Sequence, residues 1–125
     1  MNMTDSKFID SSIWIEYFIY SKFQEIIKSE EFLLTSVLSL FEIKRKLERL
    51  KIKKEDVEKS IKFIESKSII ILIDSQTAKH AAEMSIKYNL AAIDALIYSS
   101  SVEQNATLVT MDHHFKELPQ VTILE

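Results

Sequence analysis

The chain has 125 residues, enough for one domain with a substantial hydrophobic core, and its net charge of −3 excludes general attraction to nucleic acid. It contains no cysteine, which excludes disulfides and thiolate chemistry and suits a reducing compartment. No secretory signal is visible and the longest aliphatic run, residues 69–73, is too short to span a bilayer, so we expect a cytoplasmic domain over residues 1–125 without a membrane segment.

Short apolar segments of strand length alternate with segments of helical periodicity along the whole chain. In chain order the predicted elements are a strand at 7–9, a helix through 13–18, a short helix at 22–29, a strand at 32–34, helices at 37–50 and 54–67, a strand at 69–73, helices at 75–88 and 90–98, a strand at 107–110, a one-turn helix at 113–116 and a strand at 121–123. This alternation indicates a parallel sheet with helices on both faces.

Several polar residues mark where these helices begin and end. Ser11 or Ser12 can cap the first helix, Ser36 the helix at 37–50, and Asp74 the helix at 75–88. Asparagine at positions 89 and 105 takes the place of glycine, of which the chain has none, as a left-handed cap. The unbroken apolar run at 69–73 is typical of a strand covered on both faces.

The segment at 90–98 is apolar on nearly every side, with one carboxylate, Asp94, in its first turn. Such a helix is expected to be buried, where an unpaired carboxylate is costly. Asp94 therefore faces a metal ion, a distant basic partner or a polar cleft. The alternative is that it lies at the surface and interacts with the positive end of the helix dipole.

Two further carboxylates follow predicted strands. Asp10 comes directly after the first strand and Asp112 shortly after the fourth, so they meet at one edge of the sheet if these strands are neighbours. Asp94 begins the helix that leads into the fourth strand. Glu42 has two possible roles, because it can join the other acids or pair with Lys46 one turn along its helix.

Four carboxylates in one place raise one another's pKa and cannot all stay ionised unaided. A divalent cation resolves this conflict, and oxygen ligands favour Mg²⁺ or Mn²⁺. The chemistry that suits such a site is metal-assisted hydrolysis of a phosphodiester bond.

Four short motifs carry these acids in order along the chain. They are Phe8-Ile9-Asp10-Ser11-Ser12, Thr35-Ser36 with Glu42 on the following helix, Asp94-Ala95-Leu96-Ile97, and Leu108-Val109-Thr110-Met111-Asp112 with Phe115. In this order and spacing they resemble the PIN-domain nucleases, and most of all the VapC-type toxins, over essentially the whole chain.

The resemblance implies a three-layer α/β/α fold with about five parallel strands in the order 3-2-1-4-5. It assigns four residues to catalysis and metal binding: Asp10, Glu42, Asp94 and Asp112. It also implies that the Thr110 hydroxyl supports the acids, and we expect the same of Ser11. The implied activity is that of a Mg²⁺- or Mn²⁺-dependent endoribonuclease, the toxin of a type II toxin–antitoxin pair, with RNA as substrate and a small antitoxin protein as partner.

The chain departs from the family pattern after Asp112. Many relatives carry a further acid there, where this chain has His113 and His114, which bears on whether a second metal ion binds. These histidines either bind metal or carry protons, or are simply solvated in a surface turn.

The first helix is rich in aromatic residues. Trp14, Tyr17 and Phe18, together with the helix at 90–98, supply more apolar surface than one face each can bury. They belong either to the core or to a subunit interface. Since VapC-like proteins commonly dimerise and two-fold dimers are the default assembly, we expect a homodimer with these aromatic residues, or the buried helix, at the contact.

A basic segment follows Glu42 on its helix. Its members Lys44, Arg45, Lys46 and Arg49 form either a solvated helix face, a binding surface for RNA phosphates, or a surface for an acidic partner protein.

Two other functions are compatible with a parallel sheet bearing acids at strand ends. A phosphoacceptor receiver domain would use Asp74 as acceptor, but Asp10 has no neighbouring acid and residues 121–125 contain no lysine. A catalytically silent PIN-like scaffold that binds RNA or protein is the other alternative, against which the intact set of four acids argues.

Overall fold

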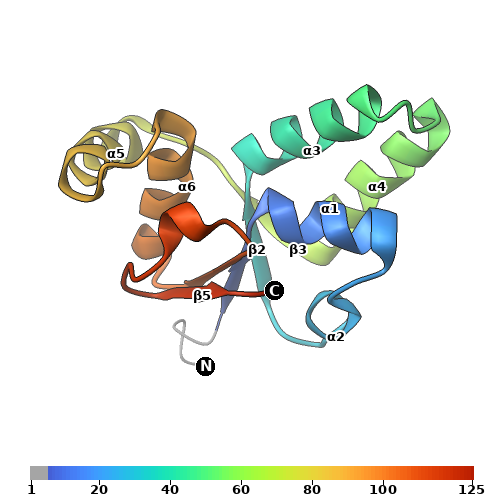
Figure 1. The fold of residues 1–125 in the computed structure, drawn as a ribbon, viewed down its shortest axis with the longest axis horizontal. Coiled ribbons are helices and arrows are strands. Elements are labelled where there is room, and N and C mark those ends of the chain that lie inside the picture. The colour runs from blue at the N-terminus through green and yellow to red at the C-terminus, as the bar shows by residue number, and fades with distance from the viewer. Residues whose placement is uncertain (1–5) are drawn as a thin grey trace.

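Five short parallel strands form the central sheet of the computed structural model, which describes residues 6–125 (Figure 1). They are β1 (Lys7–Ile9), β2 (Leu33–Ser36), β3 (Ser68–Ile71), β4 (Thr107–Thr110) and β5 (Val121–Ile123). Their order is β3-β2-β1-β4-β5, and all neighbours pair in parallel. The predicted order is confirmed, and it differs from the 2-1-3-4-5 order of receiver domains.

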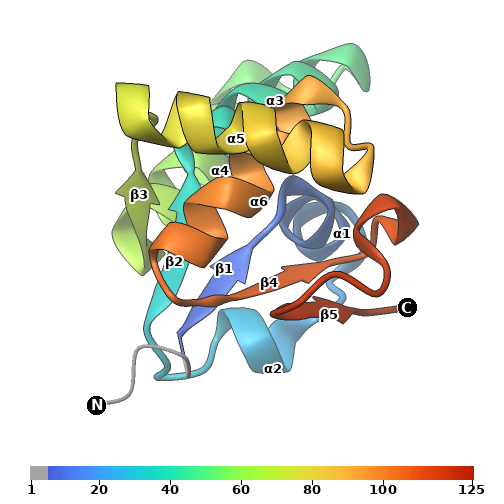
Figure 2. The ribbon, with the colours of Figure 1, turned by 90° about the vertical axis from the view of Figure 1, so that its left-hand side faces the viewer.

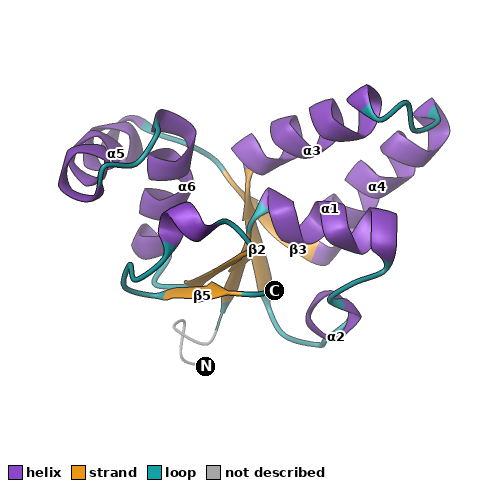
Figure 3. Ribbon diagram, viewed as in Figure 1, coloured by secondary structure: helices purple, strands orange, loops and turns teal. Residues whose placement is uncertain are grey.

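Helices cover both faces of this sheet. They are α1 (Ser11–Tyr20), α2 (Gln24–Ile27), α3 (Val37–Arg49), α4 (Lys54–Lys67), α5 (Ser75–Tyr88), α6 (Ala92–Glu103) and the 3₁₀ helix η2 (His113–Phe115). In Figures 1 and 2, α5 and α6 lie on one side of the sheet, and α1, α3 and α4 on the other; Figure 3 shows the same three layers by secondary structure. No helix among residues 6–125 is both long and apolar enough to cross a membrane.

The sheet separates two hydrophobic cores. Phe8 and Leu108 point toward α5 and α6, whereas their neighbours Ile9 and Val109 belong to the core beneath α1, α3 and α4. All four side chains are almost completely buried. Because successive strand residues face opposite sides, a sheet covered on both faces needs unbroken apolar strands, and β1 and β4 supply them.

The prediction that the strand at 69–73 is covered on both faces is wrong. The strand, β3, lies at the edge of the sheet, where Ile69 is 47% exposed and Leu72, just beyond the strand, is 71% exposed. A continuous apolar run thus occurs here without full coverage. The hydrogen-bonding partner determines the ends of this strand, because β3 matches β2 residue for residue from Leu33↔Ser68 to Ser36↔Ile71.

The expected caps are largely confirmed. The Ser36 hydroxyl accepts a hydrogen bond from the Leu38 backbone N–H at 3.0 Å, and Asp74 Oδ1 accepts one from the Thr77 N–H at 2.9 Å. Asn89 and Asn105 both adopt left-handed backbone conformations, each with φ of 54°.

The start of the first helix differs from the prediction. Asp10, rather than Ser11 or Ser12, is the N-cap residue of α1, and its side chain makes no capping hydrogen bond. Both serines lie inside the helix, and their hydroxyls are used elsewhere. The chain therefore leaves the usual cap unmade and directs these three polar side chains to the edge of the sheet.

Helix α6 continues five residues past the apolar segment that predicted it. Its second half includes three consecutive serines, Ser99 to Ser101, that are fully buried. The hydroxyls of Ser100 and Ser101 donate to backbone carbonyls of the preceding turn, at Leu96 and Tyr98. Such bonds offset the cost of burying a hydroxyl, so small polar residues extend a buried helix that hydrophobicity alone does not reveal.

Three of the aromatic residues of α1, Trp14, Tyr17 and Phe18, pack inside the chain. Trp14 is completely buried, Tyr17 stacks on Phe63 of α4 with ring centroids 5.8 Å apart, and Phe18 packs against both Trp14 and Phe63. The Trp14 indole N–H also donates to the Thr35 hydroxyl at 3.2 Å. These rings therefore join α1 to α4 in the core, and the homodimer stays a prediction.

Candidate active site

The pairing of β1 with β4 brings two of the predicted acids together at the carboxyl edge of the sheet. Ile9 pairs with Val109, and the Asp10 backbone N–H donates to the Val109 carbonyl at 3.0 Å. Asp112 follows β4 and is the N-cap residue of η2. The expectation that the first and fourth strands are neighbours is therefore confirmed.

The Asp10 carboxylate is held by two hydroxyls. Thr110 Oγ1 donates to its Oδ2 at 2.7 Å and Ser12 Oγ donates to the same oxygen at 2.9 Å. Each hydroxyl in turn accepts a backbone N–H, from Asp112 and Met111 respectively, at 3.0 Å. Because those N–H groups occupy the hydroxyl lone pairs, the hydroxyl hydrogens point at Asp10, which suits an ionised carboxylate.

Burial acts against that ionised form. Asp10 is almost completely buried, and burial raises its pKa above the ordinary value, while the bonds from Thr110 and Ser12 pull it back. Thr110 thus contacts an acid as expected. Ser12 is a supporting residue that the sequence did not single out, although a second hydroxyl two residues after the strand-end acid was the available signal.

Glu42 reaches the same edge from α3. The Ser11 hydroxyl donates to its Oε1 at 3.2 Å, so Ser11 contacts one of the acids. Burial raises the pKa of Glu42, the negative charges of Asp10 and Asp94 raise it further, and the Ser11 bond and Arg45 lower it. The structure therefore places Glu42 with the other acids, and its hydrogen bond goes to Ser11 rather than to Lys46.

Asp94 extends from the first turn of α6. Burial raises its pKa, the charges of Asp112 and Asp10 raise it further, and His114 lowers it. Asp10 and Asp94 thus act electrostatically on Glu42, and Asp10 and Asp112 on Asp94. The Asp94 side chain is only 21% exposed and has His114 as a partner, which excludes the alternative of an open surface position.

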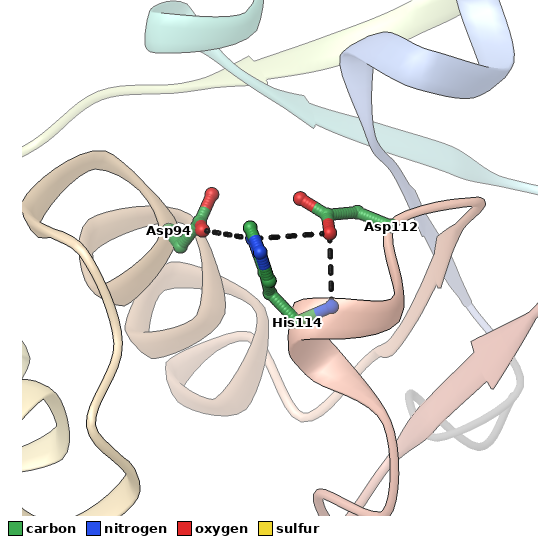
Figure 4. Close-up of side chains that lie close together, drawn as sticks. All are labelled: Asp94, Asp112 and His114. Carbon is green, nitrogen blue, oxygen red and sulfur yellow. Dashed lines mark hydrogen bonds and ion pairs between the residues drawn. The ribbon is translucent and has the colours of Figure 1, made fainter.

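Figure 4 shows the His114 ring between the carboxylates of Asp94 and Asp112. Its Nδ1 lies 3.5 Å from Asp94 Oδ2 and 3.2 Å from Asp112 Oδ1. The His114 backbone N–H donates to the same Asp112 oxygen at 2.9 Å. One potential ligand atom from each of the three residues lies within 4.8 Å of the others.

These residues fit a divalent cation. Three carboxylates have raised pKa values, and among residues 6–125 His114 is the only side chain that forms ion pairs with any of the four acids. Positive charge at this edge would relieve the repulsion. Carboxylate oxygens are the ligands preferred by Mg²⁺ and Mn²⁺.

The basic segment lies beside Glu42, but its members do not act alike. A small hollow of about 220 Å³ is lined by Glu42, Arg45, Lys46 and Arg49, with Ser11 and Ile15 from α1. Lys44 does not line it and instead forms an exposed ion pair with Glu48. Three of the four predicted basic residues therefore surround an opening next to the acids.

A larger hollow, of about 1160 Å³, opens at the opposite edge of the sheet. Its lining includes the first residues of four strands, Lys7, Leu33, Ser68 and Thr107, and the ion pair between Lys7 and Glu31. It is remote from the four acids. Volume alone therefore does not identify the site.

The model of one protein family, described as the PIN domain, matches residues 7–121. No curated protein sequence matches the chain significantly.

Several solved structures share the fold. A toxin–antitoxin complex from Klebsiella pneumoniae has a TM-score of 0.76 at 20% identity, covering 93% of this chain and 95% of that one. VapBC2 from Rickettsia felis, bound to a DNA fragment from its promoter, gives 0.74 at 22% identity, covering 96% and 97%. VapC20 from Mycobacterium tuberculosis, a Sarcin-Ricin loop cleaving toxin, gives 0.75 at 13% identity, covering 95% and 99%.

Proposed function

The chain belongs to the PIN domain family, and on that premise we propose that it is a divalent-cation-dependent endoribonuclease, the toxin of a type II toxin–antitoxin pair, formed by a single domain over residues 1–125. The observation that carries this proposal is the meeting of four carboxylates at the carboxyl edge of the sheet, where the charges of Asp10 and Asp94 raise the pKa of Glu42 and those of Asp112 and Asp10 raise the pKa of Asp94. Such a group of carboxylates can bind a divalent cation, which stabilises the negative charge that develops on the phosphate during phosphodiester hydrolysis.

Asp10, Glu42, Asp94 and Asp112 would hold the Mg²⁺ or Mn²⁺. When bound, the cation supplies positive charge that polarises the phosphate and lowers the pKa of water. The chain itself keeps the acids in place, and its hydroxyl groups favour the ionised forms of Asp10 and Glu42. Ser12 and Thr110 donate to Asp10, and Ser11 donates to Glu42.

RNA as the substrate is supported by the basic hollow beside Glu42. Arg45, Lys46 and Arg49 line a hollow beside Glu42 and can contact phosphates next to the acids, which positions the RNA without reading its sequence. One of the structural relatives is described as a toxin that cleaves the Sarcin-Ricin loop.

An antitoxin partner and a homodimer complete the proposal. Relatives from Klebsiella pneumoniae, Rickettsia felis and Salmonella typhimurium were solved as toxin–antitoxin or VapBC complexes. A small antitoxin-like reading frame beside the gene for this chain would support such a partner.

The direct test is cleavage of RNA by the purified chain with Mg²⁺ or Mn²⁺ and with EDTA. We expect cleavage only with the cation, and its abolition in Asp10→Asn and Asp94→Asn. Asp74→Asn is the matched control, because Asp74 caps α5 away from the site and asparagine caps equally well. Full activity in both site variants would overturn the assignment, and an inactive wild type that still binds RNA would favour the silent scaffold.

A further inference from the structure

We propose that His114 is a direct ligand of the divalent cation through Nδ1, so that the site holds its ion by one nitrogen as well as by carboxylate oxygens. The inference rests on the cation of the proposed function but not on the cleavage of RNA. It assigns a role in metal binding to a residue that is not one of the four acids.

The separations of the donor atoms support ligation. His114 Nδ1 is 3.2 Å from Asp112 Oδ1 and 3.5 Å from Asp94 Oδ2. In an octahedral site with bonds of about 2.1 Å, adjacent ligand atoms are roughly 3.0 Å apart. Both contacts of His114 Nδ1 are therefore close to the spacing that a shared ion requires, and all three donor atoms lie within 4.8 Å of one another. Asp94 extends from α6, whereas Asp112 and His114 both lie at the start of η2.

The backbone of His114 and its ring are both held by contacts with the acids. Its N–H donates to Asp112 Oδ1 in the first turn of η2, which places the ring beside that carboxylate. The side chain is 77% exposed, so core packing does not determine where the ring lies. What holds the imidazole in place is its contact with the two acids.

The neighbouring histidine has no such position. His113 Nε2 lies 3.7 Å from the exposed carboxylate of Glu125, at the end of the chain. The two histidines are adjacent in the sequence and both have exposed side chains, but only His114 faces the acids. His113 is therefore a matched control for every measurement on His114.

A nitrogen ligand changes which ions the site prefers. Mg²⁺ favours oxygen ligands, whereas most first-row transition ions also accept imidazole. The His114 ring should therefore raise the affinity for such an ion relative to Mg²⁺. If the ring were instead only a positive counter-charge to Asp94 and Asp112, it would compete with the cation, and its removal would tighten binding.

The test uses the full chain freed of metal with EDTA, with Mn²⁺ as a spectroscopic probe. Electron spin echo envelope modulation of bound Mn²⁺ detects a directly coordinated ¹⁴N, and calorimetry gives the Mn²⁺ and Mg²⁺ affinities. The proteins compared are the wild type, His114→Ala and His113→Ala. Alanine keeps the backbone N–H that donates to Asp112, and circular dichroism checks that both variants fold.

We expect the nitrogen signal in the wild type and in His113→Ala, and its loss in His114→Ala. The Mn²⁺ affinity of His114→Ala should fall about tenfold or more, since even residues that only support metal ligands have effects of that size. The Mg²⁺ affinity should fall less. No nitrogen signal in the wild type, a signal that survives in His114→Ala, or unchanged or tighter Mn²⁺ binding in that variant would overturn the proposal.

These readouts are independent of RNA. A nitrogen signal that depends on His114, in a protein that cleaves no RNA, would support His114 as a metal ligand and contradict the proposed nuclease activity. Cleavage of RNA by a protein without that signal would support the nuclease activity and contradict the role of His114.

Discussion

Thr110 Oγ1 donates a 2.7 Å hydrogen bond to Oδ2 of Asp10, a residue one hundred positions earlier in the chain. The bond joins the ends of β1 and β4, and the Thr110 oxygen also accepts the N–H of Asp112. One buried hydroxyl thus connects two of the acids, so substitutions there should affect both folding and the site.

Thr110→Val keeps the shape of the side chain but removes this bond. We expect the free energy of unfolding to fall by about 1–3 kcal/mol, because the buried Asp10 loses a donor and the Asp112 N–H an acceptor. Urea denaturation in EDTA measures this change. Thr110→Ser retains the hydroxyl and should restore most of the loss; equal destabilisation by both variants would show that the methyl group matters instead.

The stability of the metal-free protein should fall with rising pH through the titration of the site acids. Folding raises the pKa of Asp10, Glu42 and Asp94 above their ordinary values. The folded state then binds more protons than the unfolded state, so this contribution is fully present below a pH of about 3.8 and is lost as the pH rises through the folded-state values.

Asp10→Asn should therefore be more stable than the wild type in EDTA at neutral pH, with an advantage that shrinks as the pH falls toward 3.8. A cation should reverse the order, since Mn²⁺ at a hundred times its dissociation constant stabilises the wild type by about 2.7 kcal/mol. Thermal unfolding across pH, with and without Mn²⁺, checks both. A wild type that is the more stable protein in EDTA at neutral pH would contradict the assigned repulsion.

The basic hollow should contribute to RNA affinity through charge. In the Asp94→Asn background, where RNA survives, Lys46→Ala and Arg49→Ala should each weaken binding and flatten the dependence of log affinity on log salt by about 0.7. Fluorescence anisotropy over a range of salt concentrations measures this. Lys44→Ala is the control, because Lys44 pairs with Glu48 outside the hollow. Equal effects of all three would make the segment a general basic surface.

Light scattering at micromolar concentration should show a homodimer. Trp14, Tyr17 and Phe18 of α1 pack in the core, so the contact is better sought at exposed apolar side chains, of which Ile86 is 86% exposed and Ile93 41%. Both flank the turn between α5 and α6. Ile86→Glu should shift the protein to monomers, whereas Tyr20→Glu, on the exposed end of α1 across the sheet, should not. A monomeric wild type would end this prediction.

Pattern in the sequence was sufficient for the main elements and for a parallel sheet, whereas the strand order came from the resemblance to the PIN-domain nucleases. The apolar runs at β1 and β4 and the helical spacing in α3 and α4 each identify one element, because burial on a sheet or helix face determines them residue by residue. The ends of elements were less accessible. Helix α6 runs on through Ser99–Ser101, and α1 begins at Ser11 without a side-chain cap, since tertiary hydrogen bonds outweigh local preferences at both places.

The candidate site was predictable as a set of acids but not as a network. Asp10 and Asp112 could be placed because parallel strands end at one edge of a sheet. The role of Ser12 could not, because its two hydrogen bonds, to Asp10 and from Met111, depend on the exact docking of β4. The difference between His113 and His114 likewise depends on the turn that η2 makes, which two identical side chains in sequence cannot reveal.

The bond between Asp10 and Thr110 also determines when the candidate site can assemble during synthesis. Most buried residues of the core beneath α1, α3 and α4 lie between Ile9 and Ile64. The hydrogen bonds that hold Asp10 and Ser12 also require Thr110 of β4 and the Met111 N–H. Contacts of such sequence separation form late, after the chain between them is ordered. A nascent chain that has not yet reached β4 (Thr107–Thr110) has Asp10, Glu42 and Asp94 but not the hydroxyl that holds Asp10, so the ribosome that makes the proposed RNA-cutting protein meets it first with an unassembled site.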